Sequence, residues 1–215
     1  MSKPFECALV GAAPFNSHHF LQESFEAVVA VDGGYASLSA AGVRPCFCLG
    51  DFDSLGYVPS EPNVEVHPAM KDDSDTALAL SWAHGQGFAS VAVYGALGGR
   101  LDHTMATLQS LVGFARKGMR LVAVGEDCLV AFLSASGWNE LRLPAGLEGT
   151  VSVFAASDTA RGVSEEGLKY ELDNAVLTNG VALGLSNEFT GQESRVSVQE
   201  GELMVFLPLM PLEVL

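Results

Sequence analysis

The residues best suited to chemistry stand in the stretch Gly50-Asp51-Phe52-Asp53-Ser54. It follows an apolar run, residues 46–49, that is typical of a buried strand. Residues two apart in an extended segment point to one side, so Asp51 and Asp53 can converge on one hard cation, with Mg²⁺ the natural candidate. A solvated turn is the alternative, because Asp and Gly are also turn residues.

A third strand-end carboxylate comes from Asp32, which follows the apolar run 27–31 and precedes Gly33 and Gly34. An unbroken apolar run of this length is typical of a parallel strand buried on both faces. The two glycines would let a ligand approach the backbone closely. A plain strand-to-helix turn, which glycine also favours, is the alternative.

A second acidic cluster is Lys71-Asp72-Asp73-Ser74-Asp75, directly before an expected helix over residues 76–83. Ser74 or Asp75 can cap that helix, and acidic residues at a helix N-terminus are ordinary partners of its dipole. Three acidic residues in four positions after a lysine exceed what capping requires. We therefore expect this cluster to take part in the same site.

A glycine-rich loop follows the expected strand 90–94 and reads Gly98-Gly99-Arg100-Leu101-Asp102-His103. Such a loop before a helix presents backbone N–H groups to phosphate, and the guanidinium of Arg100 suits bidentate phosphate contact. It matches neither the P-loop nor the dinucleotide fingerprint. Asp102 would open the helix that continues to residue 117. His103 would either contact ligand or pack at the helix N-terminus, and we favour packing.

Composition excludes several classes of partner. The formal net charge is −15 with only 11 Lys+Arg, so the chain should repel nucleic acid and anionic membranes. It contains no run of 18 apolar residues, which argues against a transmembrane helix. The first residues lack the pattern of a signal peptide, and we expect a cytoplasmic protein.

Strand and helix signals alternate up to about residue 134, which predicts an α/β fold. We expect an N-terminal three-layer α/β/α domain with a mainly parallel sheet over residues 1–134. Helical periodicity then ends, and residues 135–215 are expected to form an antiparallel β-sandwich domain. Its expected strands are residues 140–143, 150–155, 168–172, 195–199 and 203–207. Ser186 and Asn187 lie between strands and could read the polar edge of a heterocycle, although a polar loop is the favoured interpretation.

Seven carboxylates stand at the ends of first-half strands: Asp32, Asp51, Asp53, Asp72, Asp73, Asp75 and Asp102. Such crowding is unfavourable unless cations compensate the charge. A divalent metal ion that bridges carboxylates and a polyphosphate resolves it. The residues therefore predict a nucleotide-dependent phosphoryl or pyrophosphoryl transferase, without naming the acceptor.

The sequence resembles the thiamine pyrophosphokinase family. The matching segments, in order, are residues 31–34, 50–54, 71–75, 98–103 and 184–187, and they cover nearly the whole chain. The resemblance implies transfer of the β,γ-diphosphate of ATP to the thiamine hydroxyl, which gives thiamine diphosphate and AMP. It also implies Mg²⁺, ATP as co-substrate, and a homodimer with active sites at the subunit interface.

Roles carry over residue by residue. Asp51, Asp53 and Asp75 would hold Mg²⁺, and Asp73 or Asp75 would orient or deprotonate the hydroxyl. The nucleotide and phosphate site would be lined by Asp32, Gly33, Gly34, Lys71, Asp72, Ser74, Gly98, Gly99, Arg100, Asp102 and His103. Ser186 and Asn187 of the partner subunit would meet the aminopyrimidine.

One position departs from the family. Tyr170 stands where similar proteins have a tryptophan near thiamine, and tyrosine stacks more weakly on a cation.

Two other functions stay open. One is a metal-dependent phosphotransferase or nucleotide hydrolase acting on another alcohol, and the other is a non-catalytic nucleotide or thiamine sensor.

Overall fold

The computed structural model describes residues 3–68 and 73–215, so Lys71 and Asp72 lie outside the described residues. The chain forms two compact units. The first contains residues 1–111 and 123–126, and the second contains residues 112–122 and 127–215. A domain boundary after residue 134 stays a prediction.

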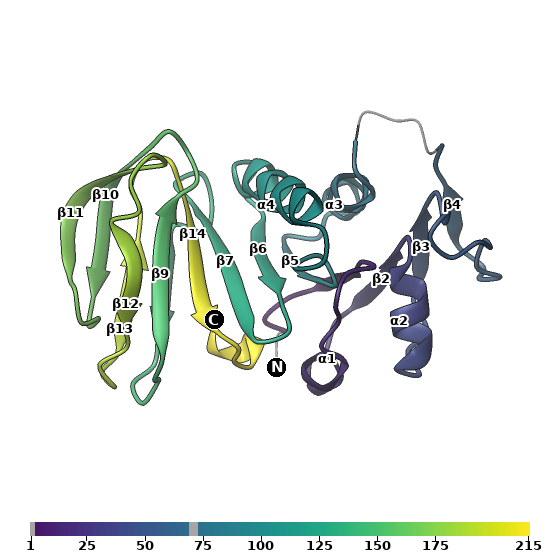
Figure 1. The fold of residues 1–215 in the computed structure, drawn as a ribbon, viewed down its shortest axis with the longest axis horizontal. Helices are drawn as coiled ribbons and strands as arrows, with labels where there is room; N and C mark the ends of the chain where they lie inside the picture. Colours follow the sequence, from purple (N-terminus) through teal and green to yellow (C-terminus); the bar gives the residue numbers. More distant parts are fainter. Residues whose placement is uncertain (1–2, 69–72) are drawn as a thin grey trace. The chain divides into compact units, whose positions relative to one another are not determined.

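The first unit is built on parallel strands in the order β5-β1-β2-β3-β4 (Figure 1). Their bounds are β1 Cys7–Val10, β2 Ala27–Val31, β3 Phe47–Gly50, β4 Val64–Val66 and β5 Ser90–Tyr94. Every residue of β1 is buried, and β2 and β5 are nearly so. Because helices cover both faces, these strands are continuous apolar runs, and the expected mainly parallel sheet is confirmed.

Helices connect these strands, and α1 and α2 lie on the other face of the sheet from α3 (Figure 1). Their bounds are α1 Ser17–Gln22, α2 Gly34–Ala40, α3 Asp75–Gly85 and α4 Leu101–Ala115. Helix α1 is capped by Asn16, whose side-chain oxygen accepts a hydrogen bond from the backbone N–H of His19 at 2.9 Å. Ser74 caps α3 by accepting a hydrogen bond from the backbone N–H of Ala77 at 3.2 Å.

The second unit is an antiparallel β-sandwich, as expected. One set of strands has the order β12-β9-β14-β7 and the other the order β11-β10-β13-β8. Inward residues of both sets are buried and apolar, for example Val153, Val163 and Val205. The bounds are β7 Cys128–Ser134, β8 Glu140–Leu143, β9 Thr150–Ala155, β10 Thr159–Glu166, β11 Leu172–Thr178, β12 Gly184–Glu188, β13 Ser194–Ser197 and β14 Glu202–Pro208. Strand β6 (Arg120–Val124) has residues in both units, and the short helix η1 is Leu212–Val214.

Two sequence expectations for this unit are wrong. Most of the expected strand 168–172 is the connection between β10 and β11, where Leu168 forms an isolated bridge with Phe189, and Leu172 is the first residue of β11. The segment around Ser186 is strand β12, not a loop. Its pairing with β9 shifts register between Gly184 and Asn187, and such a bulge hides the alternation by which a strand is recognised.

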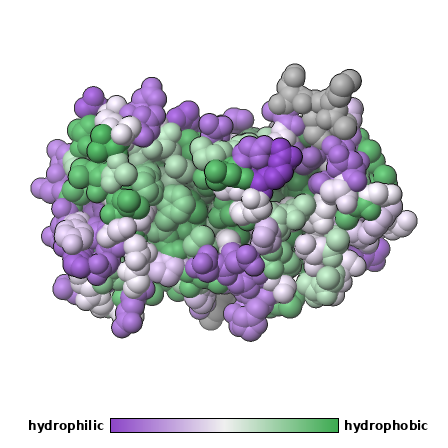
Figure 2. Space-filling view, viewed as in Figure 1, coloured by the Kyte–Doolittle hydropathy of each residue, from purple (hydrophilic) through white to green (hydrophobic). Residues whose placement is uncertain are grey.

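The second unit exposes apolar side chains at and before β12. Val181, Leu183 and Leu185 are each more than half exposed. Figure 2 shows apolar surface over β9 and β12 on the face that it draws. Exposed apolar patches of this kind mark interaction surfaces. Among the described residues, no helix is both long enough and apolar enough to span a bilayer.

Candidate active site

The pairing of β2 with β3 brings two aspartates together. Because Val31 pairs with Leu49, the residues that follow both strands emerge side by side at one edge of the sheet. The backbone N–H of Asp32 donates to the carbonyl of Leu49 at 2.8 Å. Gly50 permits this approach, because a β-carbon there would lie 2.9 Å from the Cα of Asp32.

The turn at Phe52 sets the third carboxylate. Phe52 has a left-handed backbone with φ of 56°, and its ring is only 2 % exposed. The backbone N–H of Asp53 donates to Oδ1 of Asp51 at 3.2 Å. The carboxylates of Asp51 and Asp53 therefore converge through a tight turn around a buried ring, and not through the alternation of an extended strand.

Asp32, Asp51 and Asp53 form an acidic cluster, in which one carboxylate oxygen from each lies within 4.8 Å of the others. Ser54 donates its hydroxyl to Oδ2 of Asp32 at 2.8 Å. The other oxygen of Asp32 is buried and has no hydrogen-bond partner among the described residues. The negative charge of Asp51, with smaller contributions from desolvation and from Asp32, raises the pKa of Asp53. These observations fit a cation held by oxygen ligands.

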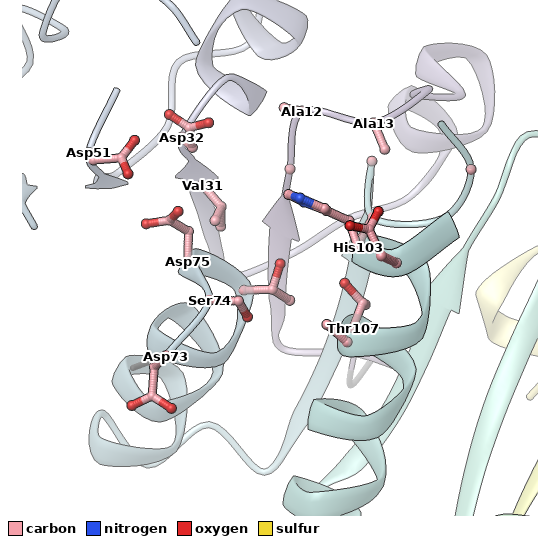
Figure 3. A pocket seen from close by; sticks show the side chains of 17 residues that line it. Ala12, Ala13, Val31, Asp32, Asp51, Asp73, Ser74, Asp75, His103 and Thr107 are labelled. Carbon is pink, nitrogen blue, oxygen red and sulfur yellow. The ribbon is translucent and has the colours of Figure 1, made fainter. Parts of the chain in front are cut away.

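A cavity of about 460 Å³ opens beside this acidic cluster, within the size range of ligand pockets. Asp32, Asp51 and Asp75 line it and direct their carboxylates toward a common space (Figure 3). Asp73 also lines the cavity, but its carboxylate points away from that space (Figure 3). Asp75 therefore adds a fourth carboxylate to the region, at the N-terminus of α3.

The opposite wall comes from the glycine-rich loop and α4. Gly98, Asp102 and His103 line the cavity, and the ring of His103 reaches toward it (Figure 3). Gly98 is held by a hydrogen bond from its backbone N–H to Oγ1 of Thr104 at 3.1 Å. His103 is exposed and available to a ligand, whereas the sequence favoured packing at the helix terminus.

Arg100 is engaged with a neighbour. Its Nε and Nη2 donate to the two carboxylate oxygens of Asp102 at 3.1 and 2.6 Å. This guanidinium lowers the pKa of Asp102. The side chain is 71 % exposed, and Arg100 is not among the described residues that line the cavity. A phosphate would have to compete with Asp102 for the guanidinium.

Three of the glycines predicted to line the nucleotide and phosphate site do not contact the cavity. Neither Gly33, Gly34 nor Gly99 belongs to the described lining of the cavity. A β-carbon on Gly34 would lie 1.8 Å from the carbonyl oxygen of Val10. Gly34 therefore lets α2 begin directly against β1, which is a packing role within the chain.

In the second unit, Tyr170 and Asn187 line a smaller cavity of about 220 Å³. Ser186 lies beside them and is exposed, with a left-handed backbone at φ of 59°. Its backbone N–H donates to the hydroxyl of Ser152 at 3.0 Å. Tyr170 is 61 % exposed, and Nζ of Lys169 lies over its ring at 5.5 Å from the centroid.

Sequence reasoning missed several residues that line the two cavities, and four of them bear on the site. Ala12 and Ala13 follow β1 and stand at a strand end, which is the signal that could have identified them. Thr107 is one helical turn after His103 and points to the same cavity, a spacing that could have identified it (Figure 3). Glu165 lines the smaller cavity and gave no signal, because its strand was not recognised.

An acidic cluster beside a cavity at the carboxyl ends of parallel strands is the arrangement expected of a kinase, an enzyme that transfers phosphate groups. Family models agree: residues 18–123 match the catalytic domain of thiamin pyrophosphokinase, and residues 139–204 match its vitamin B1 binding domain. The chain belongs to the thiamin pyrophosphokinase family.

Individual relatives support this assignment. Thiamin pyrophosphokinase 1 of Caenorhabditis elegans is 30% identical over 172 residues, which cover 75% of this chain and 69% of the relative. Thiamine pyrophosphokinase of Bacillus subtilis is 26% identical over 183 residues, covering 82% and 85%. The crystal structure of the Geobacillus thermodenitrificans thiamin pyrophosphokinase superposes with a TM-score of 0.77 at 28% identity, covering 95% of this chain and 97% of that one.

Proposed function

We propose that this protein is a thiamine pyrophosphokinase that uses ATP and Mg²⁺ to convert thiamine into thiamine diphosphate. The thiamine hydroxyl loses its proton to a nearby carboxylate or to solvent, and its oxygen bonds to the β-phosphorus of ATP. The bond from that phosphorus to the α,β-bridging oxygen breaks, and AMP leaves with the bonding electron pair. The observation that carries the proposal is the convergence of Asp32, Asp51 and Asp53 within 4.8 Å beside a cavity of about 460 Å³.

The acidic cluster is suited to Mg²⁺. Asp51 and Asp53 would hold the ion, and Asp75 faces the same space. Asp32 joins the cluster and offers a buried oxygen without a hydrogen-bond partner among the described residues, so we add it to the ligand set. When bound, Mg²⁺ would neutralise these carboxylates and the charge on the phosphates.

The opposite wall would receive the phosphates. Helix α4 spans 15 residues, and the N–H groups at its first turn are a ready anion site. His103 and Gly98 line that side of the cavity. Arg100 would contribute after leaving Asp102, which would free the guanidinium for a bidentate phosphate contact.

The thiamine hydroxyl requires a group that orients it or takes its proton. Asp73 and Asp75 both line the cavity, and only Asp75 points toward the acidic cluster (Figure 3). We assign Asp75 to metal binding and hydroxyl orientation, because the reacting phosphate would lie at the metal. Lys71 and Asp72 lie outside the described residues, so their roles rest on the sequence.

Thiamine itself would contact the second unit of a partner subunit. Tyr170 offers an exposed ring, and Ser186 an exposed hydroxyl. The exposed apolar residues Val181, Leu183 and Leu185 support a homodimer, because a second copy would cover them. Location in the cytoplasm stays a prediction from the sequence.

An assay of AMP release with and without thiamine tests the proposal. We expect AMP to form only when ATP, Mg²⁺ and thiamine are all present. Release of ADP, or release of AMP without thiamine dependence, would assign the site to another phosphotransferase or to a nucleotide hydrolase. Thiamine binding with no turnover under any divalent ion would indicate a sensor.

Asp53→Asn tests the metal site. The amide removes one anionic ligand from an exposed turn, so we expect kcat to fall roughly 100-fold or more with the fold retained. Asp173→Asn, an exposed carboxylate on β11, is the matched control and should keep wild-type turnover. Near-normal turnover of Asp53→Asn would remove Asp53 from the ligand set.

A further inference from the structure

Glu165 lines the smaller cavity and is buried, although one of its two carboxylate oxygens has no hydrogen-bond donor among the described residues. Its side chain is 0 % exposed, although carboxylates are rarely buried without a partner. Oε2 accepts a hydrogen bond from Nδ2 of Asn187 at 2.8 Å. Oε1 is buried and has no hydrogen-bond partner among the described residues. A buried acceptor left in this state is unfavourable, which points to a donor that a ligand supplies.

The orientation of Asn187 is fixed by the backbone. Its Oδ1 accepts hydrogen bonds from the backbone N–H groups of Tyr170 and Glu188, each at 2.9 Å. Nδ2 must therefore face the other way, where it donates to Glu165 and to the carbonyl of Tyr170 at 2.7 Å. Both donors and both acceptor positions of the amide are used. Asn187 thus positions Glu165 and the Tyr170 segment, and has nothing left for a ligand.

The cavity has the walls of a site for a flat ring. Its volume of about 220 Å³ is below the range for whole drug-sized ligands, so it suits one ring of a larger molecule. Leu172, Leu183 and Leu185 provide apolar walls, and Tyr170 provides an aromatic one. Glu165 lines this cavity, and its Oε1 has no hydrogen-bond donor among the described residues. An aromatic heterocycle that carries an N–H group matches this combination.

We propose that Oε1 of Glu165 accepts a hydrogen bond from the exocyclic amino group of a bound aminoheterocycle, which on the proposed function is the aminopyrimidine of thiamine. The inference rests on that function and names the residue that selects its substrate. Burial raises the pKa of the Glu165 carboxyl, and the Asn187 bond acts in the opposite direction. An amino donor against Oε1 acts together with Asn187 and favours the ionised form.

Glu165→Gln tests the contact with little change in shape. Because Asn187 can only donate here, the new amide must turn its oxygen toward Asn187 and its NH₂ toward the cavity. The group that faces the ligand then changes from acceptor to donor. We expect thiamine to bind roughly 10- to 100-fold more weakly by isothermal titration, because two donors would face each other.

Glu166→Gln is the matched control, since Glu166 is the next residue and pairs with Arg195 on the exposed side. It should bind thiamine like wild type. A thiamine analogue with hydrogen in place of the amino group completes the design. Wild type should bind this analogue about as weakly as Glu165→Gln binds thiamine, and Glu165→Gln should lose the preference for thiamine.

The outcomes separate the inference from the proposed function. Equal affinity of wild type for thiamine and the analogue overturns the contact, and needs no folded variant. Unchanged affinity of a folded Glu165→Gln also overturns it, while thiamine-dependent AMP release would still support the function. Conversely, suppose that the wild-type protein binds thiamine more tightly than the analogue but never releases AMP. This result would support the Glu165 contact and overturn the proposed kinase function.

Discussion

Two effects at Phe52, in the turn between Asp51 and Asp53, act on stability in opposite directions: burial of the ring stabilises the fold, and the left-handed backbone destabilises it. Substitutions at this position can separate the two. Its ring is only 2 % exposed, and replacing a buried phenylalanine with alanine costs about 3–5 kcal/mol. Its φ of 56° is left-handed, which disfavours any residue with a β-carbon by about 1–2 kcal/mol. Glycine relieves that strain but gains unfolded-state freedom worth about 0.4–1 kcal/mol. We therefore expect Phe52→Gly to be more stable than Phe52→Ala by roughly 0.5–1 kcal/mol.

Urea unfolding measures this difference, and Phe132 provides the control. Phe132 is 1 % exposed within strand β7, where glycine is ordinarily worse than alanine. The order of stability should thus reverse between the two positions. The left-handed turn is refuted if Phe52→Ala is as stable as Phe52→Gly while Phe132→Ala is more stable than Phe132→Gly. Both Phe52 variants retain Asp51 and Asp53, so weaker Mg²⁺ binding in both would show that the ring positions the ligands.

Three further outcomes follow from single contacts. Ser186→Ala should mainly raise the KM for thiamine, and an unchanged KM would remove Ser186 from the site. Arg100→Gln should raise the KM for ATP without changing the midpoint of thermal unfolding. The midpoint should not change because Arg100 is exposed and its ion-pair partner, Asp102, is only two residues away. A midpoint several degrees lower would indicate a structural role for Arg100. Burial raises the pKa of Glu165, so the folded state binds its proton more tightly than the unfolded chain does. The free energy of unfolding should therefore fall as pH rises from the ordinary value of 4.5 through the raised pKa, and identical pH profiles for wild type and Glu165→Gln would contradict this.

Those parts of the fold that depend on unbroken apolar runs were predictable from the sequence. The run 27–31 coincides with β2, Ala27–Val31, because a strand covered on both faces has no polar side to interrupt it. Strand β12 was not predictable in the same way. Its register shift leaves Leu185 and Ser186 both exposed, so neither an apolar run nor an alternation marks it.

The acidic cluster was predictable for a topological reason, since the carboxyl ends of neighbouring parallel strands meet at one edge. The conformation that completes it was not, because a large aromatic residue such as Phe52 rarely adopts a left-handed backbone. The pairing of Arg100 with Asp102 depends on side-chain rotamers. The burial of Glu165 depends on how β10 pairs with β13, where Glu165 is opposite Val196.

Each unit leaves one buried carboxylate oxygen without a hydrogen-bond partner among the described residues, Oδ1 of Asp32 and Oε1 of Glu165, and both residues line cavities. Their neighbours decide what each can accept. Asp32 stands among further carboxylates, so any partner must also cancel negative charge, which a divalent cation does. Glu165 stands among leucines, a tyrosine and one amide, where a hydrated cation would lose water without gaining further anionic ligands. An N–H donor on a flat ring would satisfy this oxygen, and the faces of the ring would be buried against the apolar walls. On the two proposals, the same functional group would select a metal ion in one unit and a heterocycle in the other.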